Sequence, residues 1–242
     1  MQNELENMLE RISRRRLFAA GTVAFLGLDL FTAQKSAAQS AEHIEFNQPT
    51  LTNPNDTSTE LEYYNLALRP RDESLSKTLT DLAQTNLADR PAGYLLGNNN
   101  ALPHVTVCQF KAQSNQINEI WRRAISLKNT TVELYFSHLY ISQDKKDAGL
   151  LWIGLAMKGQ AALSRLQEDV FNMLAKAGIK GTTLPEEYFP HVTWARCRAD
   201  LPLSFKILPE LALYTTPQPF ILTFGQSNDI GVYSKQILPS PY

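Results

Sequence analysis

The tetrapeptide Pro-His-Val-Thr occurs twice in this chain, and each copy lies between two apolar residues. In an extended strand, successive side chains point to opposite faces, so His104 and Thr106 share one face of the first copy. In the second copy, His191 and Thr193 share a face in the same way. The valine between each pair would anchor its strand in a core. Two such faces brought opposite each other would form a cleft with two imidazoles and two hydroxyls.

A four-residue repeat also arises by chance in some chains of this length, so its context matters. Each copy lies in a strand-like run with β-branched or aromatic residues, and two of the chain's four histidines belong to the repeat. The alternative interpretation is that both are ordinary histidines of two half-buried strands. The context favours a functional pair.

The paired His-x-Thr-apolar tetrapeptides resemble the two signature motifs of the two-histidine (2H) phosphoesterase superfamily. This superfamily includes cyclic nucleotide phosphodiesterases and 2′-5′ RNA ligase-like proteins. The order and spacing of three further stretches also follow the second half of the family: 150–155, the helix-like stretch up to Gly178, and 190–196. The resemblance covers residues 61 to 235, roughly. It implies an α+β, bilobal fold, with two antiparallel-sheet lobes related by pseudo-two-fold symmetry around a central cleft.

The spacing of apolar residues independently predicts the same class of fold. Helical spacing predicts helices at 74–86, at 117–125 and at 161–177, the last ended by Gly178. Strands are predicted at 63–68, 104–110, 131–142, 150–157 and around the second motif, with two or three more between 220 and 238. A charged turn at 144–147 predicts a hairpin. Because helix followed by strand recurs in each half, we expect two similar lobes.

Residues 1–38 have the pattern of a twin-arginine-type export signal. Arg14 and Arg15 precede two apolar residues, and a moderately apolar run follows to Phe31. With Asp29 in it, the run is too short and too polar for a spanning helix, which needs ~20 apolar residues. We therefore expect an exported protein, periplasmic or secreted, without a stable membrane span after processing. The alternative is a basic amphipathic helix at a cytosolic N-terminus.

The signal is followed by a linker and then by the folded domain. Cleavage after Ala38 or after Ser40 would satisfy the preference for small residues at the cleavage site. Residues 39–60 are polar and interrupted by prolines, which predicts a disordered linker. Residues 61–242 form the predicted 2H phosphoesterase-like domain.

Composition limits the class of partner. The chain has 242 residues, of which 43% are hydrophobic, so it can bury one sizeable core. Its formal net charge of −1 argues against a surface that binds long duplex nucleic acid. A small nucleotide or an oligonucleotide end remains compatible with this charge, and we expect the protein to act as a monomer.

The repeated residues suit the cleavage of a phosphodiester. An imidazole has an ordinary pKa near ~6.5 and can act as a general acid or a general base near neutral pH. His104 and His191 on opposite sides of a phosphate would supply one of each. Thr106 and Thr193 would donate hydrogen bonds to the phosphate oxygens as negative charge builds up. The resemblance implies these roles for the same four residues, and either histidine can be the acid, depending on the orientation of the substrate.

A metal site is the main chemical alternative, since histidine is a common metal ligand. Zinc sites need three or four ligands, and the candidates on the motif strands are Cys108 and Cys197. We expect both cysteines to be small core residues, or to form a disulfide if the protein reaches an oxidising compartment. No metal and no cofactor is expected.

Family position indicates Phe136, Tyr140 and Tyr233 as candidates for binding the substrate. His138 could line the same pocket, although a structural role is the more common one for such a histidine. Trp194, Arg196 and Arg198 form a cluster that looks suited to stacking on a base and binding phosphate. They alternate with His191 and Thr193, however, so strand periodicity predicts that they face away from the cleft.

The sequence therefore predicts a metal-independent phosphodiesterase that acts on a 2′,3′-cyclic nucleotide or on a 2′-5′-linked nucleotide or oligonucleotide. One alternative is an exported module that binds a nucleotide or an RNA end without turnover. The paired histidines favour the enzyme, because a pure binder has no need of two titratable groups. A second alternative is RNA 2′-5′ ligase-like activity, which is the same chemistry in the reverse direction.

Overall fold

The computed structural model describes residues 60–128, 130–159 and 161–238. The predicted signal and nearly all of the predicted linker lie outside these described residues. No helix in the described ranges has the length and apolar character needed to cross a membrane.

The described residues form a nine-stranded sheet in which all paired strands are antiparallel. The strands are β1 (Glu62–Pro70), β2 (Pro91–Leu95), β3 (Val105–Ala112), β4 (Thr131–Leu134), β5 (Phe136–Gln143), β6 (Leu150–Met157), β7 (His191–Arg198), β8 (Gln218–Ser227) and β9 (Tyr233–Leu238). Their order is β4-β8-β1-β3-β7-β6-β5, with β2 added to β7 and β9 added to β8.

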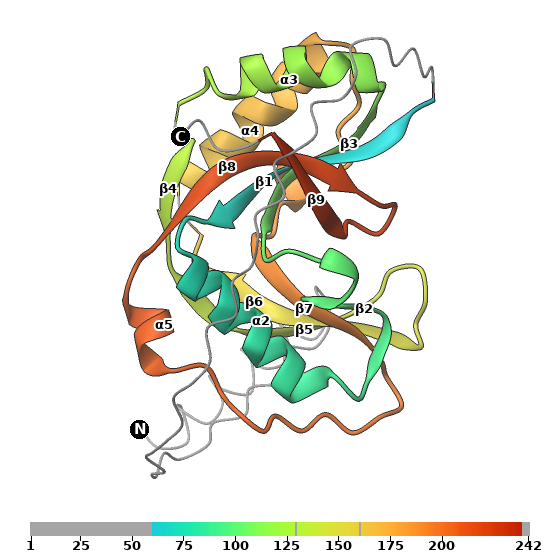
Figure 1. The fold of residues 1–242 in the computed structure, drawn as a ribbon, viewed down its shortest axis with the longest axis vertical. Coiled ribbons are helices and arrows are strands. Elements are labelled where there is room, and N and C mark those ends of the chain that lie inside the picture. The colour runs from blue at the N-terminus through green and yellow to red at the C-terminus, as the bar shows by residue number, and fades with distance from the viewer. Residues whose placement is uncertain (1–59, 129, 160, 239–242) are drawn as a thin grey trace, which may run out of the picture. The chain divides into compact units, whose positions relative to one another are not determined.

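The sheet divides into two parts at the two motif strands. Among the described residues, β3 and β7 pair at one position, Val105 with Val192, which are the valines inside the repeated tetrapeptide. We call the part with β1, β3, β4, β8 and β9 lobe 1, and the part with β2, β5, β6 and β7 lobe 2 (Figure 1). The predicted α+β fold with two antiparallel-sheet lobes is confirmed.

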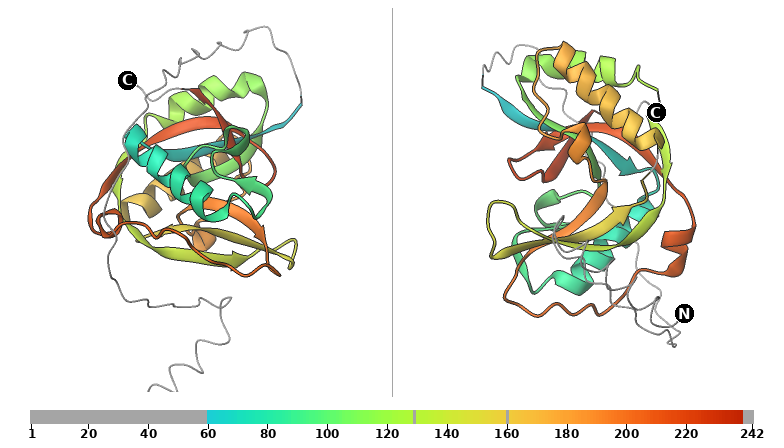
Figure 2. Two further views of the ribbon diagram at one scale, coloured as in Figure 1. Left: turned by 60° about the horizontal axis from the view of Figure 1, so that its bottom comes forward. Right: turned by 180° about the vertical axis from the view of Figure 1, so that it is seen from behind.

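Each of the two long helices packs on the lobe opposite to the strand that precedes it. Helix α2 (Glu73–Leu87) follows β1 of lobe 1 but packs on β7 of lobe 2, whereas α4 (Ala161–Lys176) follows β6 of lobe 2 but packs on β3 of lobe 1 (Figures 1 and 2). The predicted leucine stripes make these contacts, and they include the buried residues Leu75, Leu79, Leu163 and Leu166. The backs of both motif strands are therefore held in the core.

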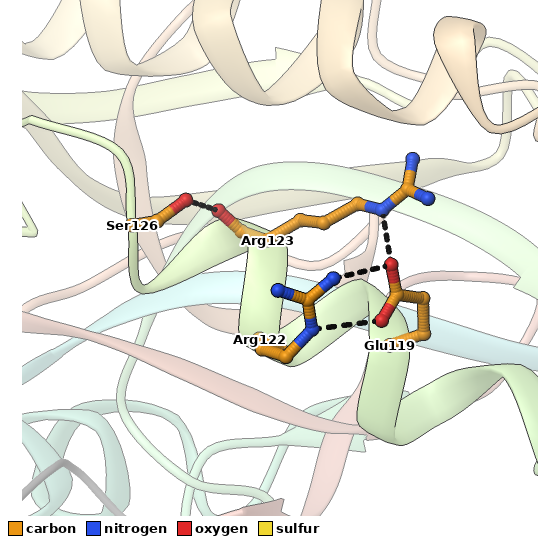
Figure 3. Close-up of polar contacts among 4 residues, drawn as sticks. All are labelled: Glu119, Arg122, Arg123 and Ser126. Atoms are coloured by element: carbon orange, nitrogen blue, oxygen red, sulfur yellow. Dashed lines mark hydrogen bonds and ion pairs between the residues drawn. The ribbon is translucent and has the colours of Figure 1, made fainter.

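Helix α3 (Ile117–Ala124) covers α4 and turns a charged face to water. On that face, Glu119 accepts hydrogen bonds from Arg122 at 2.8 and 2.9 Å and from Arg123 at 2.6 Å (Figure 3). Ser126 Oγ donates to the carbonyl oxygen of Arg123 just beyond the helix. This network satisfies exposed groups at the surface and has no contact with the cavity described below.

Two parts of the secondary structure differ from the prediction. The run 131–142, predicted as one strand, is β4 and β5, because the chain leaves lobe 1 and enters lobe 2 at Tyr135. Every residue around this crossing is suited to a strand, so periodicity carries no sign of the change of partner. Strand β2 and the short helix α5 (Leu211–Thr215) were not predicted from the sequence.

The remaining helices and strands are confirmed, as is the hairpin of β5 and β6. Trp194 is completely buried in the core, as predicted from the alternation of the strand. Cys108 and Cys197 are buried and free, so they are core residues and do not form a disulfide with each other.

Candidate active site

Each motif strand contains a β-bulge immediately after its threonine. In β3, Thr106 pairs with Ala67 and Cys108 pairs with Leu66, so two steps on β3 oppose one step on β1. In consequence Val107 and Cys108, although adjacent in the chain, both point into the core and are completely buried.

Strand β7 repeats this geometry. Thr193 pairs with Gly154 and Ala195 with Ile153, which makes Trp194 the extra residue. Trp194 and Ala195 are both completely buried. A bulge shifts the alternation by one residue, so everything beyond it changes face.

The bulge corrects the prediction for Arg196. Strand periodicity placed it on the face away from the motif side chains, but beyond the bulge it returns to the face of His191 and Thr193. There its Nε donates to Asp144 Oδ2 at 2.8 Å, and Asp144 lines the same cavity as the motif residues. Arg198 follows at the exposed end of the strand and pairs with Asp200.

One cavity of about 480 Å³ brings the four predicted catalytic side chains together. Its lining includes His104 and Thr106 of the first motif and His191 and Thr193 of the second. The wall is completed by aromatic residues and by the loops after β5 and β8, through Tyr94, Gln109, Tyr140, Ser142, Gln143, Asp144, Lys145, Lys146, Trp152, Phe189 and residues 229–232.

His104 is the more deeply buried of the two imidazoles, with 7% of its surface exposed. Its Nδ1 lies 2.8 Å from the carbonyl oxygen of Leu102, which can only accept, so Nδ1 carries the proton and Nε2 keeps its lone pair. Burial, together with the charges of His191 and Arg69, lowers the pKa of His104 to about 4, and backbone hydrogen bonds oppose this shift. The ring is therefore neutral at pH 7.

His191 has the same backbone contact in a more open position. Its Nδ1 lies 2.7 Å from the carbonyl oxygen of Phe189, again two residues earlier in the chain. In both copies this carbonyl belongs to the apolar residue before the proline, which proline restricts to an extended conformation. Burial lowers the pKa of His191, and the hydrogen bond with Phe189 opposes that shift.

The two threonine hydroxyls are oriented by different neighbours. Asn65, which is completely buried on β1, donates from Nδ2 to Thr106 Oγ1 at 3.1 Å, so the hydroxyl hydrogen of Thr106 stays available for a ligand. In lobe 2, the hydroxyl of Tyr140 lies 3.2 Å from Thr193 Oγ1. Burial raises the pKa of Tyr140, so this phenol stays protonated and can donate to Thr193.

The three candidate substrate-binding residues have different environments. Tyr140 lines the cavity and packs edge-on against His191, with ring centroids 4.8 Å apart. Tyr233 is completely buried behind His104, with ring centroids 5.2 Å apart, and donates to Thr223. Phe136 is completely buried against Phe220. Neither Phe136 nor Tyr233 lines the cavity, so the prediction that they contact the substrate is not supported.

His138 is exposed, contacts Ser137 and does not line the cavity. Sequence reasoning did not select Tyr94 and Trp152, which line the cavity with ring centroids 6.0 Å apart. Tyr94 lies on β2, a strand that begins with proline and was not predicted. Trp152 lies on a predicted strand, but the alternation of apolar residues does not show which face of a fully apolar strand is open.

The donor set of the cavity suits acid–base chemistry. Among the described residues, no group of three or more histidine, cysteine, aspartate or glutamate side chains is placed to hold a metal ion. Both imidazoles line the cavity, and each has a threonine hydroxyl beside it on the same strand face. Together they can exchange protons with a ligand and donate hydrogen bonds to its oxygens.

No family model and no curated protein matches the sequence. Similar solved structures include a phosphoesterase, which is 15% identical with a TM-score of 0.46 and covers 73% of this chain and 94% of its own. E. coli LigT complexed with 3′-AMP is 14% identical, with a TM-score of 0.43 over 69% of this chain and 87% of its own. The PDE domain of MHV ns2 is 14% identical, with a TM-score of 0.37 over 67% and 97%.

Proposed function

We propose that the protein is a metal-independent phosphodiesterase of the two-histidine type. Its substrate is a 2′,3′-cyclic nucleotide or a 2′-5′-linked nucleotide or oligonucleotide. One observation carries the proposal: two His-Thr pairs from adjacent strands line a single cavity, and each imidazole has its Nδ1 held by a backbone carbonyl. Such an arrangement orients two imidazole rings at the cavity for proton transfer.

In the proposed reaction with a cyclic phosphate, water attacks the phosphorus atom and one imidazole removes its proton. The P–O bond to one ribose oxygen breaks, and the second imidazole protonates that oxygen as it leaves. Thr106 and Thr193 donate hydrogen bonds to the non-bridging oxygens, where negative charge increases in the transition state. Tyr140 and Asn65 keep the two threonine hydroxyls in place.

The roles of the two histidines follow from their surroundings. The negative charge of a bound phosphate raises the pKa of both rings. His104 starts from the more strongly lowered pKa and is closed in by Tyr233, so it remains the neutral base. His191 is half-buried and takes up the proton more readily, which suits the general acid.

The test is an assay of the purified protein against a panel of 2′,3′-cyclic nucleotides, 2′-5′ dinucleotides and 3′-5′ dinucleotides, with and without a chelator. We expect turnover of at least one 2′,3′-cyclic or 2′-5′ substrate that the chelator does not change. Tight binding without turnover would instead favour an exported binding module. Joining of RNA ends in the same assay would favour the ligase direction.

The export signal stays a proposal about residues 1–38. We expect the mature protein to begin near Gln39 or Ala41 outside the cytoplasm. Changing Arg14 and Arg15 together to lysine should leave the precursor inside the cell. Sequencing the N-terminus of the fractionated protein decides the matter, and an intact Met1 in a soluble cytosolic pool would contradict the signal.

A further inference from the structure

Two loops, one from each lobe, border the cavity. Loop A, residues 144–149, connects β5 to β6 in lobe 2, and loop B, residues 228–232, connects β8 to β9 in lobe 1. Loop A places Lys145 and Lys146 at the cavity, and loop B places its residues 229–232 there. What holds these loops determines the width and the lining of the cleft.

We propose that Arg196 and Gln109 are equivalent positioning residues, each of which holds one of these loops against the cavity. Both lie three residues after a motif threonine, and both reach the cleft face because of the bulge between. The matching bulges therefore have a purpose beyond the catalytic pairs. Because of its bulge, each motif strand presents its histidine and threonine to the cleft and, three residues after the threonine, a side chain that anchors the adjacent loop.

Loop A is held through the carboxylate of Asp144. Arg196 Nε donates to Oδ2 at 2.8 Å, while Oδ1 accepts the backbone N–H groups of Lys146 at 2.7 Å and Asp147 at 3.2 Å. Only 7% of Asp144 is exposed, so its charge depends on these partners rather than on water. Arg196 also lies over the ring of Trp152, 5.4 Å from its centroid, and supports that part of the wall.

Loop B is held by neutral groups, and here the hydrogen bond from the motif strand goes to a backbone carbonyl. Gln109 Nε2 donates to the carbonyl oxygen of Asn228 at 2.6 Å and lies 3.3 Å from Ser227 Oγ. The side-chain Oδ1 of Asn228 then accepts the backbone N–H groups of Ile230 at 3.1 Å and Val232 at 3.0 Å. Asn228 therefore takes the place that Asp144 has in loop A.

The two anchors differ in strength. Hydrogen bonds to charged groups contribute more to stability than hydrogen bonds between neutral groups. Breaking a buried ion pair also leaves an unpaired charge in the interior. The exposed Lys145 also lies 3.7 Å from Glu187, a contact too exposed to hold loop A by itself. We therefore expect loop A to depend on Arg196 more strongly than loop B depends on Gln109.

The experiment compares Arg196→Gln with the matched variant Gln109→Leu in the full chain. Limited trypsin digestion reports on loop A directly, because Lys145 and Lys146 are cleavage sites within it. We expect Arg196→Gln to accelerate cleavage at these lysines by about tenfold or more, the size expected for losing a charged hydrogen bond. Gln109→Leu should leave this cleavage unchanged and instead increase hydrogen exchange at the amides of Ile230 and Val232.

Kinetics test the consequence for the cleft and rest on the proposed function. Arg196→Gln should raise KM about tenfold and change kcat by less than about threefold, because the catalytic pairs keep their places. Arg196→Lys should restore part of the protection, and Asp144→Asn, which keeps the shape of the side chain, should reproduce the effect of Arg196→Gln.

Unchanged cleavage in both Arg196→Gln and Asp144→Asn would overturn the proposal. A fall in kcat as large as the rise in KM would also overturn it, since Arg196 would then act on the reacting atoms. If the wild-type protein turns over no substrate of the panel, the proposed function fails, whereas digestion and hydrogen exchange still decide the positioning role.

Discussion

The two motif strands have the same sequence pattern, the same bulge and the same backbone contact, yet their histidines differ in environment. His104 is buried behind Tyr233, and its pKa is lowered to about 4. His191 is half-buried beside Tyr140 and Phe189 at the cavity. Acid–base catalysis needs one neutral and one protonated imidazole at the same pH. A duplicated motif supplies the pair, and the unequal surroundings make its two members chemically different.

The largest expected effect is the loss of either imidazole. His104→Ala and His191→Ala should each reduce turnover by about 10² to 10⁴, and the double variant should lose less than the product because the two act as one unit. Steady-state kinetics in the presence of a chelator measure this. Near wild-type turnover by His191→Ala would show that the two-histidine mechanism is wrong.

Removal of the two threonine hydroxyls should reveal a further difference between lobe 1 and lobe 2. Thr106→Val and Thr193→Val keep the side-chain shape and should each cost about 2 to 4 kcal/mol of transition-state stabilisation. Thr106→Val should also lower the free energy of unfolding by about 1 to 3 kcal/mol, because it leaves the Nδ2 of the buried Asn65 without an acceptor. Kinetics and chemical denaturation of both variants test this, and equal stability of the two variants would contradict the difference between the lobes.

Acid should destabilise the protein through His104. Its folded-state pKa of about 4 lies below the ordinary ~6.5, so the unfolded chain binds the proton more tightly. The free energy of unfolding therefore has its full value above pH 6.5 and decreases as the pH falls towards 4. The decrease due to His104 is at most about 3 kcal/mol. Denaturation curves at several pH values give the free energy of unfolding as a function of pH. This free energy should change less with pH in His104→Asn than in His191→Asn. Equal slopes would mean that burial does not distinguish the two rings.

The smallest effects concern the two tyrosines. Tyr140→Phe removes the hydroxyl beside Thr193 and should lower kcat about three- to tenfold, with little change in stability. Tyr233→Phe removes a buried hydrogen bond to Thr223 and should cost about 1 kcal/mol of folding free energy with little change in kcat. Thermal unfolding and kinetics of the pair distinguish the roles, and a change in kcat for Tyr233→Phe alone would reverse them.

The local pattern of the sequence determined the three longest helices, most strands and the two His-Thr pairs that line the cavity. The spacing of apolar residues in a helix or strand follows from the geometry of that element alone. The leucine stripes and the His-x-Thr alternation can therefore be recognised without knowing which elements pack beside them. For the same reason, the side chains that share a face over three residues, such as His191 and Thr193, were placed correctly.

Only the tertiary structure decided which residues outside the two His-x-Thr motifs belong to the site. The bulges at Val107 and Trp194 depend on how a strand pairs with its neighbour, and they bring Gln109 and Arg196 to the cleft against the alternation of the sequence. The crossing at Tyr135 and the burial of Phe136 likewise depend on a choice of partner strand. Strand pairing joins residues distant in the chain, so its register is set by hydrogen bonds and core packing that no local pattern contains.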